Sequence, residues 1–158
     1  MFRSLTRFKQ ALSQQECLQV LQQEKRGVLA VLGDEGYPYA LPVNHWYDPE
    51  TGKLCFHGGR KGHRIDALER CDKVSFCVYD GGTQSQEGWW LDFRSVIVFG
   101  RARRVEDHDR ALEISRRLSY RFTQDEAYID HEIRHSGPGV AVYEIEVEHM
   151  TGKLVHER

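Results

Sequence analysis

The segment from Cys55 to Arg70 combines glycines and basic side chains in a pattern that could bind a phosphate group. A short apolar strand comes first, a glycine-rich turn follows, and an amphipathic helix begins directly afterwards. Glycine permits positive φ and close approach of the backbone to a ligand, and the first amides of a helix have no partner within it. The glycines of the turn are Gly58, Gly59 and Gly62, and its basic residues are Arg60, Lys61, His63 and Arg64.

Among these residues, Arg64 has the geometry to hold a phosphate through two hydrogen bonds, whereas Lys61 would act as a mobile point charge. The pattern therefore predicts a phosphate-binding turn. The alternative is a strand-to-helix connection with a solvated basic surface, because turns of this kind are common.

Two polar residues, Asn44 and His45, interrupt the apolar strand expected over 37–47. As neighbours on a strand they point to opposite faces unless a bulge turns one of them. Backbone groups of this strand could still face the edge of a flat ligand. For His45 the alternative is a buried histidine with an ordinary hydrogen bond, and Ser95, on a later strand, could simply be a small polar residue.

The pentapeptide from His131 to His135 matches the H-E-x-x-H pattern of zinc metalloproteases. Such a site needs a buried helix and a third ligand further along the chain. Here Gly137 and Pro138 end the helix, and only a strand-like tail remains. We therefore interpret the pentapeptide as part of a solvated helix and expect no metal site.

Composition limits the classes of function. With 158 residues, of which 40% are hydrophobic, the chain can form one domain with a substantial core. A net charge of −2 gives no electrostatic reason to expect nucleic-acid binding, and no apolar run is long enough to cross a membrane. The four cysteines form no C-x-x-C pair, so we expect reduced thiols and a cytoplasmic location.

Hydrophobic periodicity predicts more strands than helices. The first helix begins at a capping box formed by Ser13 and Glu16, and a second capping box is expected at Thr123 and Glu126. The expected helices cover 14–23, about ten residues after the basic turn, 111–122, and the segment from the second capping box to Gly137. The expected strands cover 28–32, 37–47, 54–57, 74–78, 89–105 and 141–147.

The order of these elements favours a barrel. Pro38 and Pro42 place their strand at an edge or a bulge, and the long strand at 89–105 can bend at Gly100. The glutamates at 144, 146 and 148 are expected to form a solvated face that discourages edge pairing. Strands follow one another as hairpins rather than as βαβ units. We therefore expect one mostly β (α+β) domain over residues 1–158, a small antiparallel barrel with peripheral helices.

Taken in order, these segments resemble the pyridoxamine 5'-phosphate oxidase-like flavoproteins, and among them most closely the nitroimidazole-resistance branch. The resemblance covers residues 27–153. It rests on the strands 41–47 and 54–57, the Gly-x-x-x-Gly-His-Arg turn that starts at Gly58, Val74-Ser75-Phe76, and the strand 94–102. Proteins of this family are FMN-binding split barrels that work as homodimers with flavin at the subunit interface.

The resemblance implies that Gly62, His63 and Arg64 hold the FMN phosphate, where Arg64 replaces the lysine often found in the family. It also implies that the isoalloxazine is edged by Val43, Asn44, His45 and Trp46, and that Ser95 reaches the flavin of the partner subunit. We take His45 as the candidate proton donor or hydrogen-bond partner near the reacting edge, because the ordinary pKa of histidine lies near neutrality. The full set assigned to the cofactor is Val43, Asn44, His45, Trp46, His57, Gly58, Gly59, Lys61, Gly62, His63, Arg64 and Ser95.

The end of the chain, from His149 to Lys153, lacks the Arg-Leu-x-Pro type of ending expected in the oxidase itself. The resemblance therefore implies an FMN-dependent oxidoreductase that reduces a small nitroaromatic or similar compound, with NADH or NADPH as the electron donor. The alternative is a protein of the same fold that binds flavin or haem without turnover. The sequence does not identify the substrate or the donor.

Overall fold

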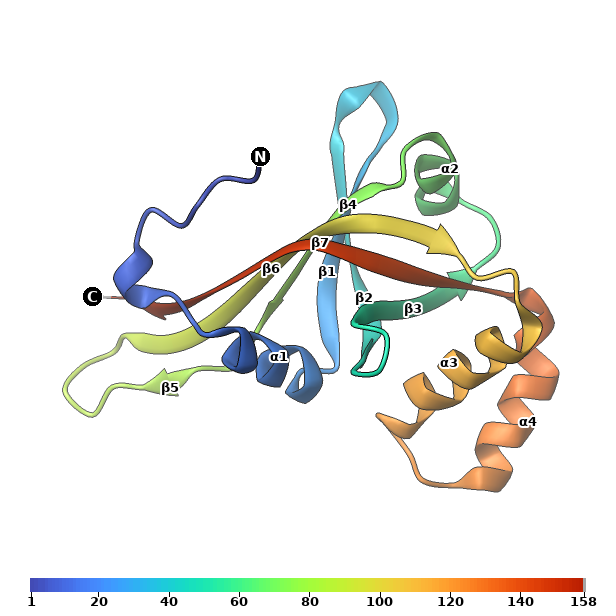
Figure 1. Cartoon of the computed structure of the whole chain (residues 1–158). Helices are drawn as coiled ribbons and strands as arrows, with labels where there is room; N and C mark the ends of the chain where they lie inside the picture. Colours follow the sequence, from blue (N-terminus) through green and yellow to red (C-terminus); the bar gives the residue numbers. More distant parts are fainter. Residues whose placement is uncertain (158) are drawn as a thin grey trace.

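The computed structural model describes residues 1–157, which form a mostly antiparallel β structure with peripheral helices (Figure 1). The strands are β1 (Arg26–Leu32), β2 (Pro38–Asp48), β3 (Lys53–Gly59), β4 (Lys73–Tyr79), β5 (Thr83–Gln84), β6 (Leu91–Arg104) and β7 (Val140–His156). The α-helices are α1 (Gln14–Gln23), α2 (His63–Arg70), α3 (His108–Tyr120) and α4 (Glu126–Ser136). Short 3-10 turns lie at Phe8–Gln10, Asp34–Gly36 and Gly137–Gly139.

The strands close into a barrel. Their order is β4-β1-β2-β3-β7-β6-β5, and β4 also pairs with β6, so six strands form a closed ring with β5 attached to β6. Every pairing between the strands is antiparallel. The predicted fold class, a small antiparallel barrel with helices at its periphery, is confirmed.

Strand β2 changes partner along its length. Its first part pairs with β1, from Pro38 to Asn44, and its second part pairs with β3, from His45 to Asp48. Both prolines lie in the first part, where the ladder with β3 is absent, so the predicted edge position is confirmed locally. Beyond the pair His45 and Phe56 the strands β2 and β3 diverge. This split leaves Asn44 and His57 at the mouth of a gap.

The longest strands, β6 and β7, cross the molecule together and bend (Figure 1). Their register shifts between Phe99 and Gly100. A Cβ atom at Gly100 would overlap the carbonyl oxygen of Glu146, so a side chain at this position would push the two strands apart. The bend predicted at Gly100 is therefore confirmed.

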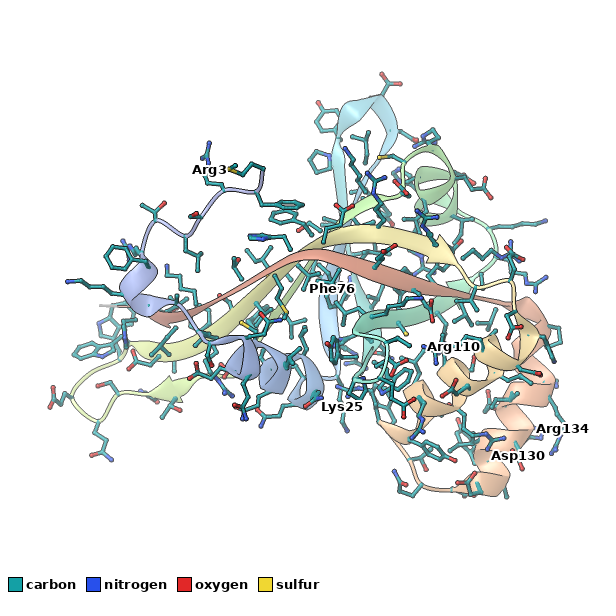
Figure 2. The ribbon with its side chains drawn as sticks, in the orientation of Figure 1. Arg3, Lys25, Phe76, Arg110, Asp130 and Arg134 are labelled. Carbon is teal, nitrogen blue, oxygen red and sulfur yellow. The ribbon has the colours of Figure 1, made fainter. Side chains whose placement is uncertain are left out.

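The barrel interior is filled by alternating side chains from its strands, among them Leu29, Phe56, Phe76 and Val98 (Figure 2 labels Phe76). Helix α1 covers one end of the barrel and adds Cys17, Val20 and Leu21 to the same core. Both bonds of the predicted capping box between Ser13 and Glu16 are present. The boundaries of this helix match the prediction.

Helices α3 and α4 form a hairpin that covers the outer side of β2, β3 and β7 (Figure 1). Ile114 and Leu118 of α3 pack against Cys55 and Val142. The hairpin thus buries one part of the outer surface of the barrel. The predicted capping residue of α4 is wrong, because the side chain of Asp125, not Thr123, accepts the hydrogen bond from the backbone of Tyr128.

An ion-pair network anchors α3 to the strands. The Arg110 guanidinium lies 2.5 Å from Asp48 and 2.8 Å from Glu144, and Lys53 lies 2.6 Å from Glu144 (Figure 2 labels Arg110). Burial alone would raise the pKa of Asp48, but hydrogen bonds from Arg110 and Thr51 hold it below its ordinary value. The expected edge position is wrong for the whole strand, since β7 lies between β3 and β6, and the expected solvated position is wrong for Glu144, since its carboxylate is paired with Lys53 and Arg110.

The α3–α4 hairpin does not extend over the outer side of β1, β4, β6 and the first part of β2 (Figure 1), where the ring of Phe2 stacks on that of Phe99 with 5.7 Å between centroids. The side chains at its centre carry no charge, although outward positions of a strand are ordinarily polar. We call this surface the open face; its central residues are Val28, Ala30, Ala40, Pro42, Ser75, Cys77, Ile97 and Phe99.

In residues 1–157, no helix has the length and hydropathy needed to cross a bilayer.

Candidate functional site

The predicted phosphate-binding turn joins the end of β3 to the start of α2. Gly62 precedes the helix with φ of 115°, a conformation that a side chain would strain, and no side chain caps the helix. The backbone N–H groups of Ile65 and Asp66 bond to the carbonyl of Gly62. Those of His63 and Arg64 have no hydrogen-bond partner within residues 1–157. Two free amides therefore point out of the start of α2.

The other two glycines of the predicted turn, Gly58 and Gly59, do not provide the positive φ that was expected of them. They continue β3 and pair with β7. A Cβ atom at Gly58 would overlap the guanidinium of Arg64, whereas one at Gly59 would meet no atom within 4 Å. Gly58 is needed because it makes room for an arginine, and Gly59 carries no such constraint.

Arg64 lies folded back over the end of β3. Its guanidinium carbon is 5.7 Å from the centre of the Phe56 ring, and its Nε is buried without a hydrogen-bond partner in the structure. A buried polar atom is ordinarily satisfied. A phosphate seated at the two free amides would meet a guanidinium held close by, so the residues present fit a phosphate group.

His63 contributes to the turn through its backbone rather than through its ring. The ring stacks on Tyr39 with 4.1 Å between centroids, and its Nε2 accepts a hydrogen bond of 3.2 Å from the backbone of Asp34. The Asp34 carboxylate in turn lies 2.7 Å from Arg70 at the end of α2. These contacts fix α2 against the turn between β1 and β2, and they hold the free amides in place.

His57 stands where β2 and β3 diverge, and its side chain is exposed. Crowding by the surrounding protein, with repulsion from Arg64 as a smaller cause, lowers its pKa below the ordinary value for histidine. The ring is therefore held neutral near pH 7 and can donate one hydrogen bond and accept another. Asn44 lies at the same gap, where its Oδ1 accepts a hydrogen bond of 2.9 Å from Arg26.

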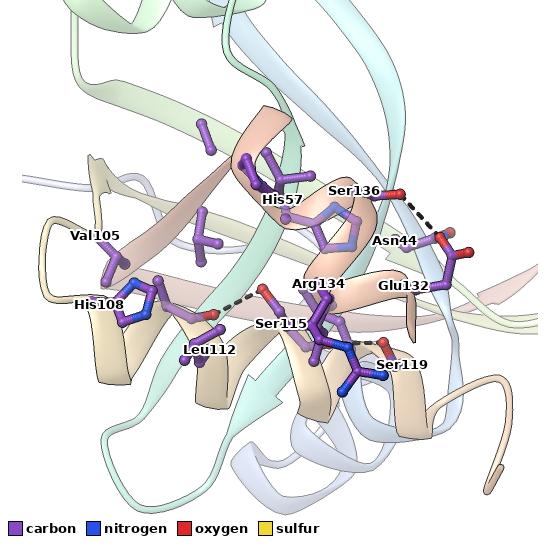
Figure 3. A pocket seen from close by; sticks show the side chains of 18 of the residues that line it. Asn44, His57, Val105, His108, Leu112, Ser115, Ser119, Glu132, Arg134 and Ser136 are labelled. Carbon is purple, nitrogen blue, oxygen red and sulfur yellow. Dashed lines mark hydrogen bonds between the residues drawn. The ribbon is translucent and has the colours of Figure 1, made fainter. Parts of the chain in front are cut away.

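A cavity of about 750 Å³ opens beside these two residues (Figure 3). It lies between the α3–α4 hairpin and the ends of β2, β3 and β7, and Arg60 also lines it. The Nε of Arg60 donates a hydrogen bond of 3.2 Å to the carbonyl of Val140. The phosphate-binding turn and the cavity therefore meet along His57 and Arg60, and one extended ligand could occupy both.

The structure contradicts the prediction that the side chain of His45 donates a proton. Its exposed fraction is 1%, its Nε2 lies 2.8 Å from the carbonyl oxygen of Leu21, and its ring packs edge-on against Phe76. Burial lowers its pKa to about 4. The alternative, a core histidine with an ordinary hydrogen bond, describes it correctly.

The neighbours of His45 are also turned away from a ligand. Val43 is buried in the core. Trp46 lies beneath α3, and the guanidinium carbons of Arg110 and Arg117 are 5.8 and 5.9 Å from its ring. Of the four residues predicted to edge the isoalloxazine, only Asn44 therefore presents its side chain to the cavity.

Two further residues assigned to the cofactor, Lys61 and Ser95, lie in different parts of the structure. Lys61 is exposed and forms no ion pair within the described part of the chain. Ser95 pairs with Tyr79, six positions along β6 from the pair formed by Arg101 and Lys73. At about 3.3 Å per residue this separates Ser95 from the start of β4, near α2, by roughly 20 Å. Within one chain, Ser95 does not belong to the phosphate-binding turn.

The H-E-x-x-H pentapeptide lies on α4, where His131 and His135 stack with 5.8 Å between ring centroids. The described residues contain no group of three or more histidine, cysteine, aspartate or glutamate side chains placed to hold a metal ion. Glu132, the central acid of the pattern, instead accepts a hydrogen bond of 3.1 Å from Ser136 at the cavity wall.

Sequence reasoning missed the contribution of α3 and α4 to this site. Ala111 and Leu118 of α3 pack towards the strands and also line the cavity, and Phe122, just after α3, lines it while 47% exposed. The available signal was the close succession of two helices just after a strand, which implies a hairpin folded back on the sheet. Which face of that hairpin would leave a cavity depends on side-chain volumes across three elements.

Comparison with known proteins places this geometry in a family. No curated protein sequence matches the chain. A protein from Bacteroides thetaiotaomicron, named as a candidate 5-nitroimidazole antibiotic resistance protein, has 23% identity and a TM-score of 0.79, over 92% of this chain and 87% of that one. An FAD-binding protein from Mesorhizobium loti has 23% identity and a TM-score of 0.63, over 92% and 96%.

A flavocytochrome from Azotobacter vinelandii has the same fold, with 19% identity and a TM-score of 0.70 over 96% of this chain and 72% of that one. At these identities the likeness concerns the fold. The model of the pyridoxamine 5'-phosphate oxidase family matches residues 13–154, which is most of the sequence. The chain therefore belongs to the pyridoxamine 5'-phosphate oxidase family.

Proposed function

We propose that this protein binds FMN and acts as an FMN-dependent oxidoreductase on a small nitroaromatic or similar oxidised compound. The observation that carries the proposal is the phosphate-binding turn, which combines two free amides at the start of α2 with the partnerless Nε of Arg64. One arginine and two amides suit a single phosphate, as in FMN. An FAD-binding protein and a flavocytochrome among the structures of similar fold support a flavin as the class of cofactor.

The rest of the cofactor would extend from the turn past His57 to Asn44 and the cavity. Arg64 and the amides of α2 would hold the phosphate, while the gap between β2 and β3 would receive one edge of the ring system. Bound FMN supplies two-electron transfer, and the protein supplies orientation and electrostatics. We assign to His57, in place of His45, the role of hydrogen-bond partner at the reacting edge, because its ring is exposed at the cavity and held neutral.

A second copy of this chain is the proposed partner. The open face is uncharged at its centre, and Ile97 and Phe99 are each 40% exposed. An apolar centre rimmed by charged residues such as Arg26 and Lys73 is typical of an interface. Ser95 lies on the same side of β6, so a partner docked here could bring its own Ser95 to the flavin, as the resemblance implies.

The first experiment is an absorption spectrum of the purified protein, followed by addition of FMN and titration with NADH and NADPH. We expect bands of a bound flavin, bleaching on addition of one of the two donors, and recovery when a nitroaromatic acceptor is added. A protein that takes up no flavin would contradict the proposal. Flavin that binds but is never reoxidised by nitro or quinone acceptors would favour a binding protein without turnover.

The free thiols suit a reducing compartment, and we propose the cytoplasm. Cys17 and Cys55 are buried, and Cys71 and Cys77 are partly buried, with no disulfide among them. Burial raises the pKa of Cys55 to about 12, so this thiol is inert near neutral pH.

A further inference from the structure

We propose that the cavity between α3, α4 and the strand ends selects a small aromatic acid, whose ring lies on the apolar wall and whose carboxylate binds Arg134. This inference rests on the proposed function for its place beside the flavin, and it narrows the substrate class. It is carried by the shape, the apolar lining and the charge balance of the cavity.

The cavity has the size and wall of a small-molecule site. Its volume of about 750 Å³ falls within the usual range for ligand pockets. Much of the wall is apolar, supplied by α3, the α3–α4 connection, α4 and the start of β7. The apolar lining residues include Val105, Ala111, Leu118, Phe122, Ile133 and Val142. Such a wall favours a flat hydrocarbon ring over a sugar or a peptide.

The charges around the cavity leave a cation available. Glu106 lies 3.5 Å from Arg104, and Glu132 accepts the hydrogen bond from Ser136, so both carboxylates of the lining already have partners. Three arginines line the cavity: Arg104 is the partner of Glu106, Arg60 donates its Nε hydrogen to the carbonyl of Val140, and the side chain of Arg134 forms no ion pair or hydrogen bond within residues 1–157. Its neighbour Asp130, one turn earlier on α4, is hydrogen-bonded to Arg116 at 2.5 Å, and the charge of Arg134 acts on it only from a greater distance.

The hydroxyl groups of the opposite wall do not compete for this role. In α3 the hydroxyl of Ser115 donates to the carbonyl of Ala111, and that of Ser119 donates to the carbonyl of Ser115. Both hydroxyl hydrogens are therefore engaged within α3 and are not free to bind a carboxylate. Figure 3 shows Arg134 extending from α4 towards the side of α3 that carries these serines. A carboxylate in the cavity would therefore find its strongest donor in the guanidinium of Arg134.

The test compares three probes that share one ring: 4-nitrobenzoate, 4-nitrobenzyl alcohol and 4-nitrobenzylamine. Their dissociation constants are measured by calorimetry on the protein saturated with FMN and on the protein without it. We expect 4-nitrobenzoate to bind about tenfold more tightly than the alcohol, because a hydrogen-bonded charge pair is gained, and the amine to bind most weakly.

Two arginine variants locate the effect. Arg134→Gln should reduce the preference for the acid over the alcohol to less than twofold. Arg103→Gln removes the same charge from an exposed position that does not line the cavity, and it should keep the tenfold preference. Circular dichroism checks that both variants remain folded, and binding of the alcohol reports whether the cavity itself is intact.

Equal affinity for the acid and the alcohol in the wild type would overturn the inference. So would an equal loss of the preference in Arg103→Gln, because the effect would then come from net charge. Flavin uptake is read separately by absorbance. FMN binding without acid selectivity would leave the proposed function standing and refute this inference, whereas acid selectivity without FMN binding would do the reverse.

Discussion

Two sides of the outer surface of the barrel differ in how far helices cover them. Over β2, β3 and β7 the α3–α4 hairpin buries Cys55 and Val142, and the ion pair between Arg110 and Asp48 anchors it to the strands. Over β1, β4 and β6 the open face keeps Ile97 and Phe99 partly exposed, with no charged residue at its centre. The helices of the chain cover one apolar surface, whereas on the other only the ring of Phe2 stacks on Phe99, at 5.7 Å between centroids, and Ile97 and Phe99 stay 40% exposed.

The proposed site lies at the boundary of these two sides. Asn44 belongs to the part of β2 that borders the open face, and it also lines the cavity beneath the hairpin. A partner on the open face would therefore stand beside the flavin, while α3 and α4 would shape the substrate end. In the proposed arrangement, the chain itself would determine which substrate binds, and the partner would complete the cofactor site.

The largest expected effect tests the covered side. Ile114 of α3 is fully buried against the strands, so Ile114→Ala should lower the free energy of unfolding by about 2–5 kcal/mol. Chemical denaturation measures it. Leu112, on the same helix, is 38% exposed, and Leu112→Ala should cost much less. Similar losses for the two variants would mean that the hairpin does not pack as described.

The next effect tests the open face. Ile97→Lys places a charge at its centre and should weaken self-association on the order of a hundredfold, since each subunit would bury an unpaired lysine. Light scattering over a dilution series measures the change. Gln19→Lys adds the same charge on the exposed surface of α1 and should leave association unchanged. A wild type that stays monomeric at high concentration would refute the proposed partner.

A smaller effect comes from His45, in the interior that both sides enclose. Its pKa in the folded state, about 4, lies below the value near 6.5 expected when unfolded. The unfolded state therefore binds the proton first, and stability falls as the pH drops from 6.5 towards 4. His57 shifts in the same direction.

The free energy of unfolding should fall by roughly 1–2 kcal/mol between pH 6.5 and 5, and His45→Gln should flatten this dependence. Denaturation curves at several pH values measure the slope. His135→Gln changes an exposed histidine and should leave the slope as it is. A slope that survives the loss of His45 would assign it to another group.

Much of this fold could be predicted from the sequence because its signals are local. The capping box at Ser13, the prolines of β2 and the bend at Gly100 each act through neighbouring backbone. Local signals could not predict which residues of β6 point into the barrel. Both of its faces are apolar, and only the closed barrel shows that Val96 and Val98 point inward while Ile97 and Phe99 point outward.

The site was predictable to the same extent. The turn around Gly62 and Arg64 is contiguous in sequence, so its chemistry was visible. The burial of His45 depends on α1, whose Leu21 carbonyl lies against the ring, and the placing of Arg134 depends on a helical hairpin folding back over the strands. The local sequence of a segment does not show which distant segment it will contact, so these placements could not be predicted.

The central claim is that the turn at the start of α2 binds the phosphate of FMN. It is tested most directly by measuring the affinities for FMN and for riboflavin, which lacks the phosphate, in the wild type and in Arg64→Gln. We predict that the wild type binds FMN at least about tenfold more tightly than riboflavin, and that the variant loses most of this difference while still binding riboflavin. Equal affinity of the wild type for the two flavins would contradict the account.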